Sequence, residues 1–466
     1  MTVWLKLLAV LGLSVPVAPL PAGQADADPL DKYVREQSRA AGVPGVAYAV
    51  VGPDGIRRQG AFGVDGDGQD VGPRTPFLWG SVSKPVTATL AVLLARDGVL
   101  DLDSPVAKLL PSYPTAPTSV RQLLDHTSGL PEGLQLTDRY DEGRSIASVI
   151  PRIADLEPVA EPGSRHSYSS LNYVVLGAVV EAVTGQPFAL VLSERLLQPA
   201  EMSRTLADPG QTLPPGHRFV FGTARPFTTR IDPATVPAGY LAGSVTDLAA
   251  YARTQLAGGP VLTDQERTLL HTPRTDNYAL GWRTSQVPGT NEPMLWHAGA
   301  APGYQAAILL LPQRGQAVVV LQNAYGPFHD ALLLDTARGI ASHLAGSTPE
   351  HHDVDPVYPA ALAGLGLVTA LLFAFTIGTT IRLFRGPKPG PRKRRLIWLG
   401  LTLLALGAVA FALASLPGFA GVSRGQLALW APDLSWLVHA GLALAVVLAV
   451  LRILAAARAT VSRNST

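Results

Sequence analysis

The chain has 466 residues, of which 47% are hydrophobic and 15% are charged, and its net charge at pH 7 is +2. This balance provides no basic field that would attract nucleic acid, so no nucleic-acid partner is expected. Cysteine is absent, which excludes disulfides, a thiolate nucleophile and cysteine metal ligands. The hydrophobic content is high enough for a large core and for membrane segments.

Residues 1–27 are predicted to be a secretory signal peptide. Lys6 supplies a charged start, residues 7–15 form a short apolar run, and residues 25–27 (Ala-Asp-Ala) offer a small-residue cleavage site. The alternative is an uncleaved anchor. However, the apolar run is short for a membrane span and three prolines interrupt the sequence after it.

Residues 28–346 are predicted to form one α+β domain. Strand-like runs at 45–51 and 56–62 flank a Gly-Pro-Asp-Gly turn, and a second hairpin is expected from 306–311 and 316–322. Helical patterns lie between these hairpins, at 84–96, 119–124, 171–183 and 245–256. This order predicts an antiparallel sheet flanked by helices, with a mainly helical region inserted between its N-terminal and C-terminal strands.

The sequence Ser81-Val82-Ser83-Lys84 stands at the start of the first helical pattern. Spacing of i and i+3 on a helix places the Ser81 hydroxyl and the Lys84 amine on one face, about 5–6 Å apart at Cβ. A serine hydroxyl is a poor nucleophile near neutral pH, and a neighbouring amine can take its proton. The helix N-terminus adds partial positive charge where an oxyanion would form. This is the chemistry of S-x-x-K acyl-transfer enzymes, although the motif alone is common by chance.

No metal site and no cofactor are expected. The run at 65–70 (Asp-Gly-Asp-Gly-Gln-Asp) fails the calcium-loop pattern, because Pro76 stands where a glutamate is required. No H-E-x-x-H zinc motif occurs in the sequence. His351, His352 and Asp353 could form a metal cluster, but we interpret residues 347–356 as a solvated linker.

Residues 357–466 are predicted to form a membrane domain with three transmembrane helices, at about 357–381, 396–420 and 434–456. Basic residues gather between the first two spans and after the third. The positive-inside rule therefore places the first connection and the C-terminus in the cytoplasm and residues 28–346 outside, as a signal peptide also requires. We interpret the helices as an anchor in the lipid bilayer.

Six sequence landmarks follow one another in residues 28–346, beginning with Ser81-x-x-Lys84. The others are Asp97-Gly98-Val99-Leu100-Asp101, Asp125-His126-Thr127-Ser128-Gly129, Tyr168-Ser169-Ser170, Ala238-Gly239-Tyr240 and Trp296-His297-Ala298-Gly299. This ordered set closely resembles the serine β-lactamase-like family of class C β-lactamases, D,D-peptidases, D-aminopeptidases and related esterases. The resemblance covers nearly the whole domain.

The resemblance implies catalytic roles for three side chains. Ser81 would be the nucleophile that forms an acyl-enzyme, and Lys84 would be the partner that accepts its proton. Tyr168 opens the family's Tyr-x-Asn element and would move protons to the leaving group and from water. The alternative to a catalytic role is that Tyr168 is an ordinary core tyrosine.

The same resemblance implies that residues 297–300 line the substrate cleft. The backbone N–H groups of Ser81 and Ala300 would form the oxyanion hole, and Gly299 would let substrate approach the backbone. His297 stands where the family often has a lysine, and would bind substrate or complete a hydrogen-bond network. A neutral histidine binds a substrate carboxylate less well than lysine, which argues against an efficient β-lactamase.

Four further positions concern departures from the family pattern or residues that are expected to be structural. Ser170 stands where the Tyr-x-Asn element has asparagine, and its hydroxyl could still bond Lys84. Asn172, two residues on, is expected to point elsewhere on a helix. Asp125 and His126 belong to a family hallmark that we interpret as structural.

Together these features predict a membrane-anchored extracytoplasmic serine hydrolase that cleaves an amide or ester of a small-molecule or peptide substrate. The three-helix tail resembles that of prodrug-maturing peptidases such as the colibactin-maturing peptidase, which implies removal of an N-acyl-D-amino-acid cap. Action on D-amino-acid peptides, β-lactamase activity and esterase activity are open alternatives. A different class is a penicillin-binding sensor, acylated without turnover. The oligomeric state is not predicted.

Overall fold

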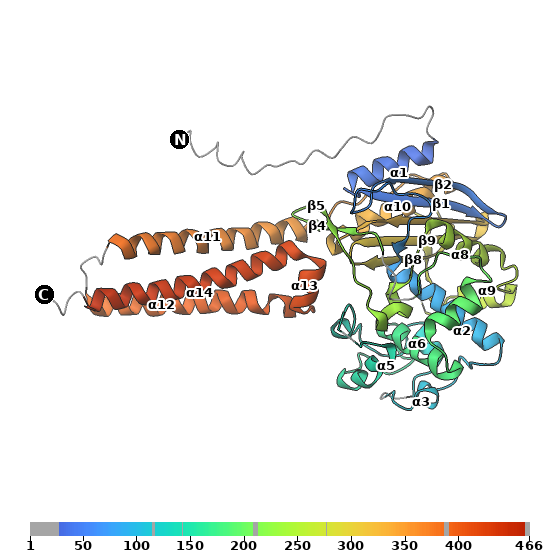
Figure 1. The fold of residues 1–466 in the computed structure, drawn as a ribbon, viewed down its shortest axis with the longest axis horizontal. Helices are drawn as coiled ribbons and strands as arrows, with labels where there is room; N and C mark the ends of the chain where they lie inside the picture. Colours follow the sequence, from blue (N-terminus) through green and yellow to red (C-terminus); the bar gives the residue numbers. More distant parts are fainter. Residues whose placement is uncertain are drawn as a thin grey trace.

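The computed structural model describes residues 28–113, 117–141, 143–207, 213–275, 277–385 and 391–461. The predicted signal peptide at 1–27 lies outside these ranges. Figure 1 shows two parts, a domain of sheet and helices and a bundle of long helices that projects from one side of it.

A six-stranded antiparallel sheet forms the centre of the domain, in the order β2-β1-β10-β9-β8-β7. The N-terminal hairpin therefore lies beside the C-terminal strands, which confirms the predicted α+β architecture. The strands are β1 (Gly45–Gly52), β2 (Gly55–Gly63), β7 (Arg283–Gln286), β8 (Pro293–Ala301), β9 (Tyr304–Leu311) and β10 (Gln316–Gln322).

Strand β1 is buried along its whole length, because helices cover both faces of the sheet. Side chains alternate between faces with period two. Val46, Tyr48 and Val50 pack in a cluster with α1 (Pro29–Ala40) and α10 (Asp330–Ala345). The intervening residues of β1 belong to the main core, which includes α8 (Val245–Ala257).

The inserted region is mainly helical, and α2 (Ser83–Arg96) runs through its centre. Every residue from Ser83 to Leu94 is buried, so this helix is enclosed on all sides. It ends at Asp97 and Gly98, where a positive φ of 70° suits glycine. Helix α6 (Ser170–Thr184) packs beside it, and α4 (Val120–Leu124) packs on α6.

Three helices of the C-terminal region are long and apolar enough to cross a membrane. They are α11 (Val357–Arg385), α12 (Arg392–Phe419) and α14 (Pro432–Val461), and each contains one of the predicted spans. A short helix, α13 (Arg424–Trp430), lies between α12 and α14 at the end of the bundle that meets the domain (Figure 1). The last turn of α11 and the first turn of α12 lie at the far end of the bundle (Figure 1).

Hydrogen bonds join the bundle to the hairpin of β4 (Gly216–Val220) and β5 (Thr223–Phe227). Asp433, at the start of α14, accepts from the backbone N–H of Phe221 at 2.7 Å and from the Tyr358 hydroxyl at 2.5 Å. Asp433 and Tyr358 are both buried. The bundle is therefore packed against the domain, a contact that the sequence analysis did not anticipate.

The segment interpreted as a solvated linker is attached to α10. Asp335 accepts from the His352 backbone N–H at 2.6 Å and lies 2.7 Å from His352 Nδ1. Within the described ranges, no group of three or more histidine and carboxylate side chains could hold a metal ion. His352 thus fastens this largely exposed segment to α10.

Candidate active site

Ser81 lies in a single 3-10 turn, Gly80–Val82, immediately before α2. The sequence pattern placed it at a helix start, and the structure places it one short turn earlier. Gly80 has a φ of +51°, and a β-carbon there would lie 2.5 Å from the backbone N of Ala300. Glycine at this position therefore lets the end of β8 approach the turn that carries Ser81.

Lys84 is completely buried, and its Nζ contacts three oxygen atoms. They are Ser81 Oγ at 2.9 Å, Ala238 O at 2.8 Å and Ser170 Oγ at 3.3 Å. An ammonium group can donate to all three. A neutral amine can donate to Ala238 O and Ser170 Oγ and accept the Ser81 proton on its lone pair. The same heavy-atom positions therefore suit the site before and after a proton moves from Ser81 to Lys84.

A cavity of about 510 Å³ brings most of the predicted site residues together. Ser81, Tyr168, Ser170 and Ala300 all line it. The Tyr168 ring centroid is 5.0 Å from Lys84 Nζ, so the tyrosine lies beside the serine and lysine pair. Nucleophile, amine and phenol types thus share one concave site, the setting expected for an enzyme centre.

Gly299 lies against the turn that carries Ser81. A β-carbon on Gly299 would lie 1.9 Å from Trp79 O and 2.8 Å from Ser81 N. The strand and the turn are therefore in direct backbone contact. This contact brings the backbone of Ala300 next to that of Ser81, as an oxyanion hole would require.

His297 is buried and belongs to a chain of hydrogen bonds rather than to the described cavity lining. Its Nδ1 lies 2.8 Å from Ala298 O, which can only accept, so Nδ1 carries the proton. Its Nε2 then accepts from the Tyr278 hydroxyl at 3.2 Å. Of the two roles predicted for His297, completing a hydrogen-bond network is the one that this geometry fits.

The chain continues from Tyr278 to His126. The Tyr278 oxygen lies 3.2 Å from His126 Nε2, which donates because His126 Nδ1 accepts from the Ser169 backbone N–H at 3.2 Å. Burial lowers the pKa of both His126 and His297 well below 6.5, so both rings are neutral at pH 7. This arrangement agrees with the structural interpretation of His126.

The departures from the family pattern have a clear geometry. Ser170 reaches Lys84, as expected. Asn172 points away from it, donating to His126 Nδ1 at 2.9 Å and accepting from the Ser128 hydroxyl at 2.6 Å. The family position of Ser170 and the helical spacing of Asn172 therefore predicted these two directions correctly.

Sequence reasoning missed Tyr278 and Arg283, which enter the site from outside the matched motifs. The Arg283 guanidinium lies 4.8 Å from the Tyr168 ring centroid and 5.6 Å from the Trp296 ring. Among the residues that the structure describes, no carboxylate lies within 4 Å of it. No local signal marked either residue, because each acts through contacts with distant parts of the chain.

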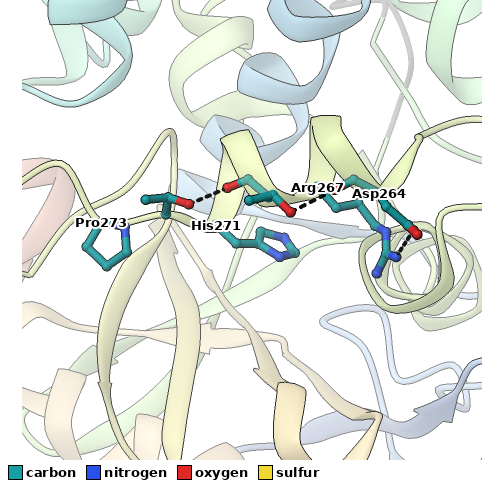
Figure 2. A pocket seen from close by; sticks show the side chains of 6 residues that line it. Asp264, Arg267, His271 and Pro273 are labelled. Carbon is teal, nitrogen blue, oxygen red and sulfur yellow. Dashed lines mark hydrogen bonds and ion pairs between the residues drawn. The ribbon is translucent and has the colours of Figure 1, made fainter.

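A second cavity, of about 380 Å³, lies along α9 (Asp264–His271) and contains none of the predicted site residues. Figure 2 shows its lining side chains, with the Arg267–Asp264 ion pair at one end. His271 Nε2 lies 3.0 Å from Gln255 Oε1, and burial lowers its pKa to about 4. We therefore assign the chemistry to the first cavity.

The fold and the cavity define a protein of the S-x-x-K type, in which a serine and a buried lysine meet beneath the edge of an antiparallel sheet. The sequence model of the Beta-lactamase family matches residues 30–342. The chain belongs to this family of hydrolases, which confirms the resemblance inferred from the motifs.

Penicillin-binding protein 4 of Amycolatopsis lactamdurans is 30% identical over 339 residues, covering 65% of this chain and 86% of that protein. A structure of SurE with D-Leu shares 27% identity and a TM-score of 0.58, covering 69% of this chain and 76% of that one. The D-amino acid amidase of Ochrobactrum anthropi SV3 has a TM-score of 0.60 at 19% identity, covering 68% and 99%. This last likeness concerns the fold.

Proposed function

We propose that the chain is a serine hydrolase that cleaves an amide or ester bond through an acyl-enzyme on Ser81. The observation that carries this proposal is the 2.9 Å contact between Ser81 Oγ and the buried Lys84 Nζ, at a cavity that Tyr168 also lines. An amine at this distance can receive the hydroxyl proton as the oxygen becomes a nucleophile.

Each proton has a destination in this mechanism. Ser81 Oγ bonds to the substrate carbonyl carbon while its proton passes to Lys84 Nζ. The backbone N–H groups of Ser81 and Ala300 stabilise the oxyanion. As the bond to the leaving group breaks, Tyr168 delivers a proton to the departing amine or alkoxide. Water then attacks the acyl-enzyme carbonyl and gives up a proton to the Tyr168 oxygen, which restores the phenol. The bond between the acyl carbon and Ser81 Oγ breaks as Lys84 Nζ returns the proton to Oγ, and the acid product leaves.

We propose a D-amino-acid derivative as the substrate, either a D-amino-acid peptide or an N-acyl-D-amino-acid cap on a larger molecule. The supporting observation is the likeness to a SurE structure with D-Leu. Ser170 and His297 depart from the residues that many lactamases of the family carry. We therefore favour peptidase or amidase activity over β-lactamase and esterase activities.

We propose that α11, α12 and α14 anchor the enzyme in a lipid bilayer, with the catalytic domain extracytoplasmic and the C-terminus cytoplasmic. Arg382, Arg385 and Arg458 lie in the last turns of α11 and α14, away from the domain (Figure 1). This distribution suits the positive-inside rule.

Intact-mass analysis of the full chain with a substrate panel tests the proposal. The panel contains benzylpenicillin, a D-Ala-D-Ala peptide, an N-acyl-D-amino-acid amide and a short ester. A transient adduct with product release supports a hydrolase, whereas a permanent adduct supports the sensor alternative that the Penicillin-binding protein 4 relative brings to mind.

Ser81→Ala should abolish the adduct, and Ser83→Ala is the matched control. The Ser83 hydroxyl accepts from the Leu241 backbone N–H at 3.2 Å and serves the same helix start without facing the cavity. An adduct that persists in Ser81→Ala would remove Ser81 from the mechanism.

A further inference from the structure

The cavity that contains Ser81 has a second end, formed by the connection between α12 and α14. Residues from this connection line it alongside Ser81, Tyr168 and Ser170, although they lie at least 250 positions further along the chain. They are Ala420, Val422, Gln426, Leu427, Trp430 and Ala431. The site is therefore completed by the membrane region and not by the hydrolase domain alone.

Specific contacts hold α13 in this position. Trp430 Nε1 donates to Asp138 Oδ2 at 3.2 Å, and the Tyr240 hydroxyl donates to Asp138 Oδ1 at 2.7 Å. The Trp430 ring meets the Tyr325 ring edge to face, with centroids 5.5 Å apart. Asp138, Tyr240 and Tyr325 all line the cavity, so α13 is fixed to its wall.

The last turn of α13 has a second attachment. Arg218, on β4, donates to the carbonyls of Ala428 and Leu429 at 3.2 and 2.9 Å. A cation at a helix C-terminus satisfies carbonyl groups that have no partner within the helix. The position of α13 therefore depends on contacts from three separate parts of the catalytic domain, at Asp138, Tyr325 and Arg218.

The chemistry of this end of the cavity excludes an anionic ligand. Leu427, Trp430 and Phe328 supply apolar surface, and the charged side chains among the described lining residues are Glu132 and Asp138. No lysine or arginine stands among those lining residues. A negatively charged group would be repelled here, whereas each buried methylene of a neutral chain would gain about 0.8 kcal/mol.

The apolar surface continues from the cavity towards the bundle. Leu427 lines the cavity and also packs in a cluster with Tyr358, Leu362 and Leu365 of α11. One side chain thus belongs both to the substrate cavity and to the apolar end of the membrane helices.

We propose that this end of the cavity is a subsite for an aliphatic acyl chain of the substrate, and that α13 is its specificity-determining wall. This inference rests on the proposed acyl-enzyme at Ser81, because that bond fixes where the chain must lie. A short acyl group would leave the subsite empty, and a longer one would fill it.

Hydrolysis of p-nitrophenyl acetate and p-nitrophenyl hexanoate by the full chain in lipid nanodiscs tests the subsite. The wild type should prefer hexanoate by about tenfold or more in kcat/KM, because four further methylenes are buried. Leu427→Trp, which fills the subsite, should lower the ratio of kcat/KM for hexanoate to kcat/KM for acetate about tenfold.

Ala428→Trp is the matched control, since it places the same side chain on the exposed face of the same helix, outside the described cavity lining. It should change kcat/KM for neither ester. Leu427→Ala, which removes volume, should raise the preference for octanoate over hexanoate and so tests the subsite even if Leu427→Trp fails to fold.

Equal effects of Leu427→Trp on both esters, or no preference for hexanoate in the wild type, would overturn the subsite. The mass of the Ser81 adduct separates this failure from failure of the proposed function. An adduct without chain-length selectivity contradicts only the subsite, whereas the absence of any adduct contradicts the acyl-enzyme on which the subsite depends.

Discussion

The Tyr278 hydroxyl donates to Nε2 of the buried His297 at 3.2 Å, and through this bond β8 is connected to His126 on the opposite side of the site. His297 Nδ1 in turn donates to Ala298 O, so the series of hydrogen bonds ends on strand β8 itself. The chain of donors runs in one direction, because a backbone carbonyl at its end can only accept. It therefore fixes the strand that lies against Ser81.

Tyr278→Phe should break this chain and leave His126 Nε2–H and His297 Nε2 buried without partners, at a cost of about 1–3 kcal/mol for each group. We expect a lower melting temperature and a fall in kcat of about tenfold or more, with KM less affected, because β8 loses its support beside the oxyanion site. Thermal melting and steady-state kinetics measured well below the melting temperature check this.

Tyr251→Phe is the control for a buried tyrosine, since its hydroxyl lies 3.0 Å from Thr89 Oγ1 and does not belong to the described cavity lining. It should lower stability and leave kcat within about twofold, as expected of a change away from the reacting groups. Equal kcat in Tyr278→Phe and the wild type would mean that this series of hydrogen bonds contributes to stability alone.

Arg283→Gln should weaken binding of substrates that carry a free carboxylate. Its guanidinium lies over the Tyr168 ring and has no carboxylate within 4 Å among the residues described, so it can attract an anionic substrate group. A hydrogen bond to a charged group is worth about 1.5–3 kcal/mol, which corresponds to an increase in KM of about tenfold or more. KM is measured for a D-Ala-D-Ala peptide and for its C-terminal amide.

Arg338→Gln is the matched control for that measurement. Arg338 also lies over the Trp296 ring, at 5.2 Å, but no contact with Tyr168 accompanies it. It should leave both KM values within about twofold, as for a surface change remote from the site. If Arg283→Gln raises KM equally for the acid and the amide, the guanidinium does not recognise the carboxylate.

Gly299→Ala should separate β8 from the turn that carries Ser81. The added β-carbon would lie 1.9 Å from Trp79 O, a distance that backbone atoms cannot accommodate without moving apart. We expect a loss of stability of about 1–3 kcal/mol. We also expect kcat/KM to fall about a hundredfold, since displacements near 1 Å can have that effect.

Gly72→Ala provides the comparison, because a β-carbon at Gly72 has no neighbour within 4 Å. Kinetics and chemical denaturation are measured on both variants. Wild-type kcat/KM in Gly299→Ala would show that the contact between β8 and Ser81 is not needed for catalysis.

Stability should fall when the pH is lowered below about 6.5. Burial lowers the pKa of His126 and His297 well below that value, so below it the unfolded chain binds protons on them that the folded chain does not. The free energy of unfolding then decreases by up to about 1.4 kcal/mol per pH unit for each histidine, and the contribution is complete above pH 7. Asp138 acts in the opposite direction, because burial raises its pKa.

Comparison of wild type with His297→Gln isolates the histidine contribution from that of the carboxylates. Melting temperatures between pH 7.5 and pH 5 should depend less steeply on pH in the variant, by the share of one histidine. Parallel curves for the two proteins would mean that His297 titrates equally in the folded and unfolded chains.

The parts of the site that the sequence predicted are those set by local spacing. Ser81 and Lys84 are three positions apart, and the helical period alone brings their side chains together. The helical period also indicated that Asn172 points away from Lys84, whereas the contact between Ser170 and Lys84 was implied by the resemblance to the family. The strands at both ends of the domain were recognisable because turn residues separate apolar runs of strand length.

The parts that the sequence did not predict depend on contacts between distant segments. Trp430 is 292 positions from Asp138, and nothing near either residue indicates their hydrogen bond. A tryptophan beside a predicted membrane span is typical of the membrane interface, so the residue type gave no indication of this contact. Tyr278 and Arg283 likewise carry no motif, because only the folded sheet brings them to Tyr168.

Asp433 restrains the helix bundle relative to the catalytic domain. It bonds the first turns of the bundle to a hairpin of the catalytic domain through buried partners, so the two parts share one joint rather than a flexible tether. An enzyme on a flexible linker would adopt a wide range of heights and orientations above the membrane. With the helices in a bilayer as proposed, this one holds Ser81 at a single height and orientation, and substrates must come to that level to meet it.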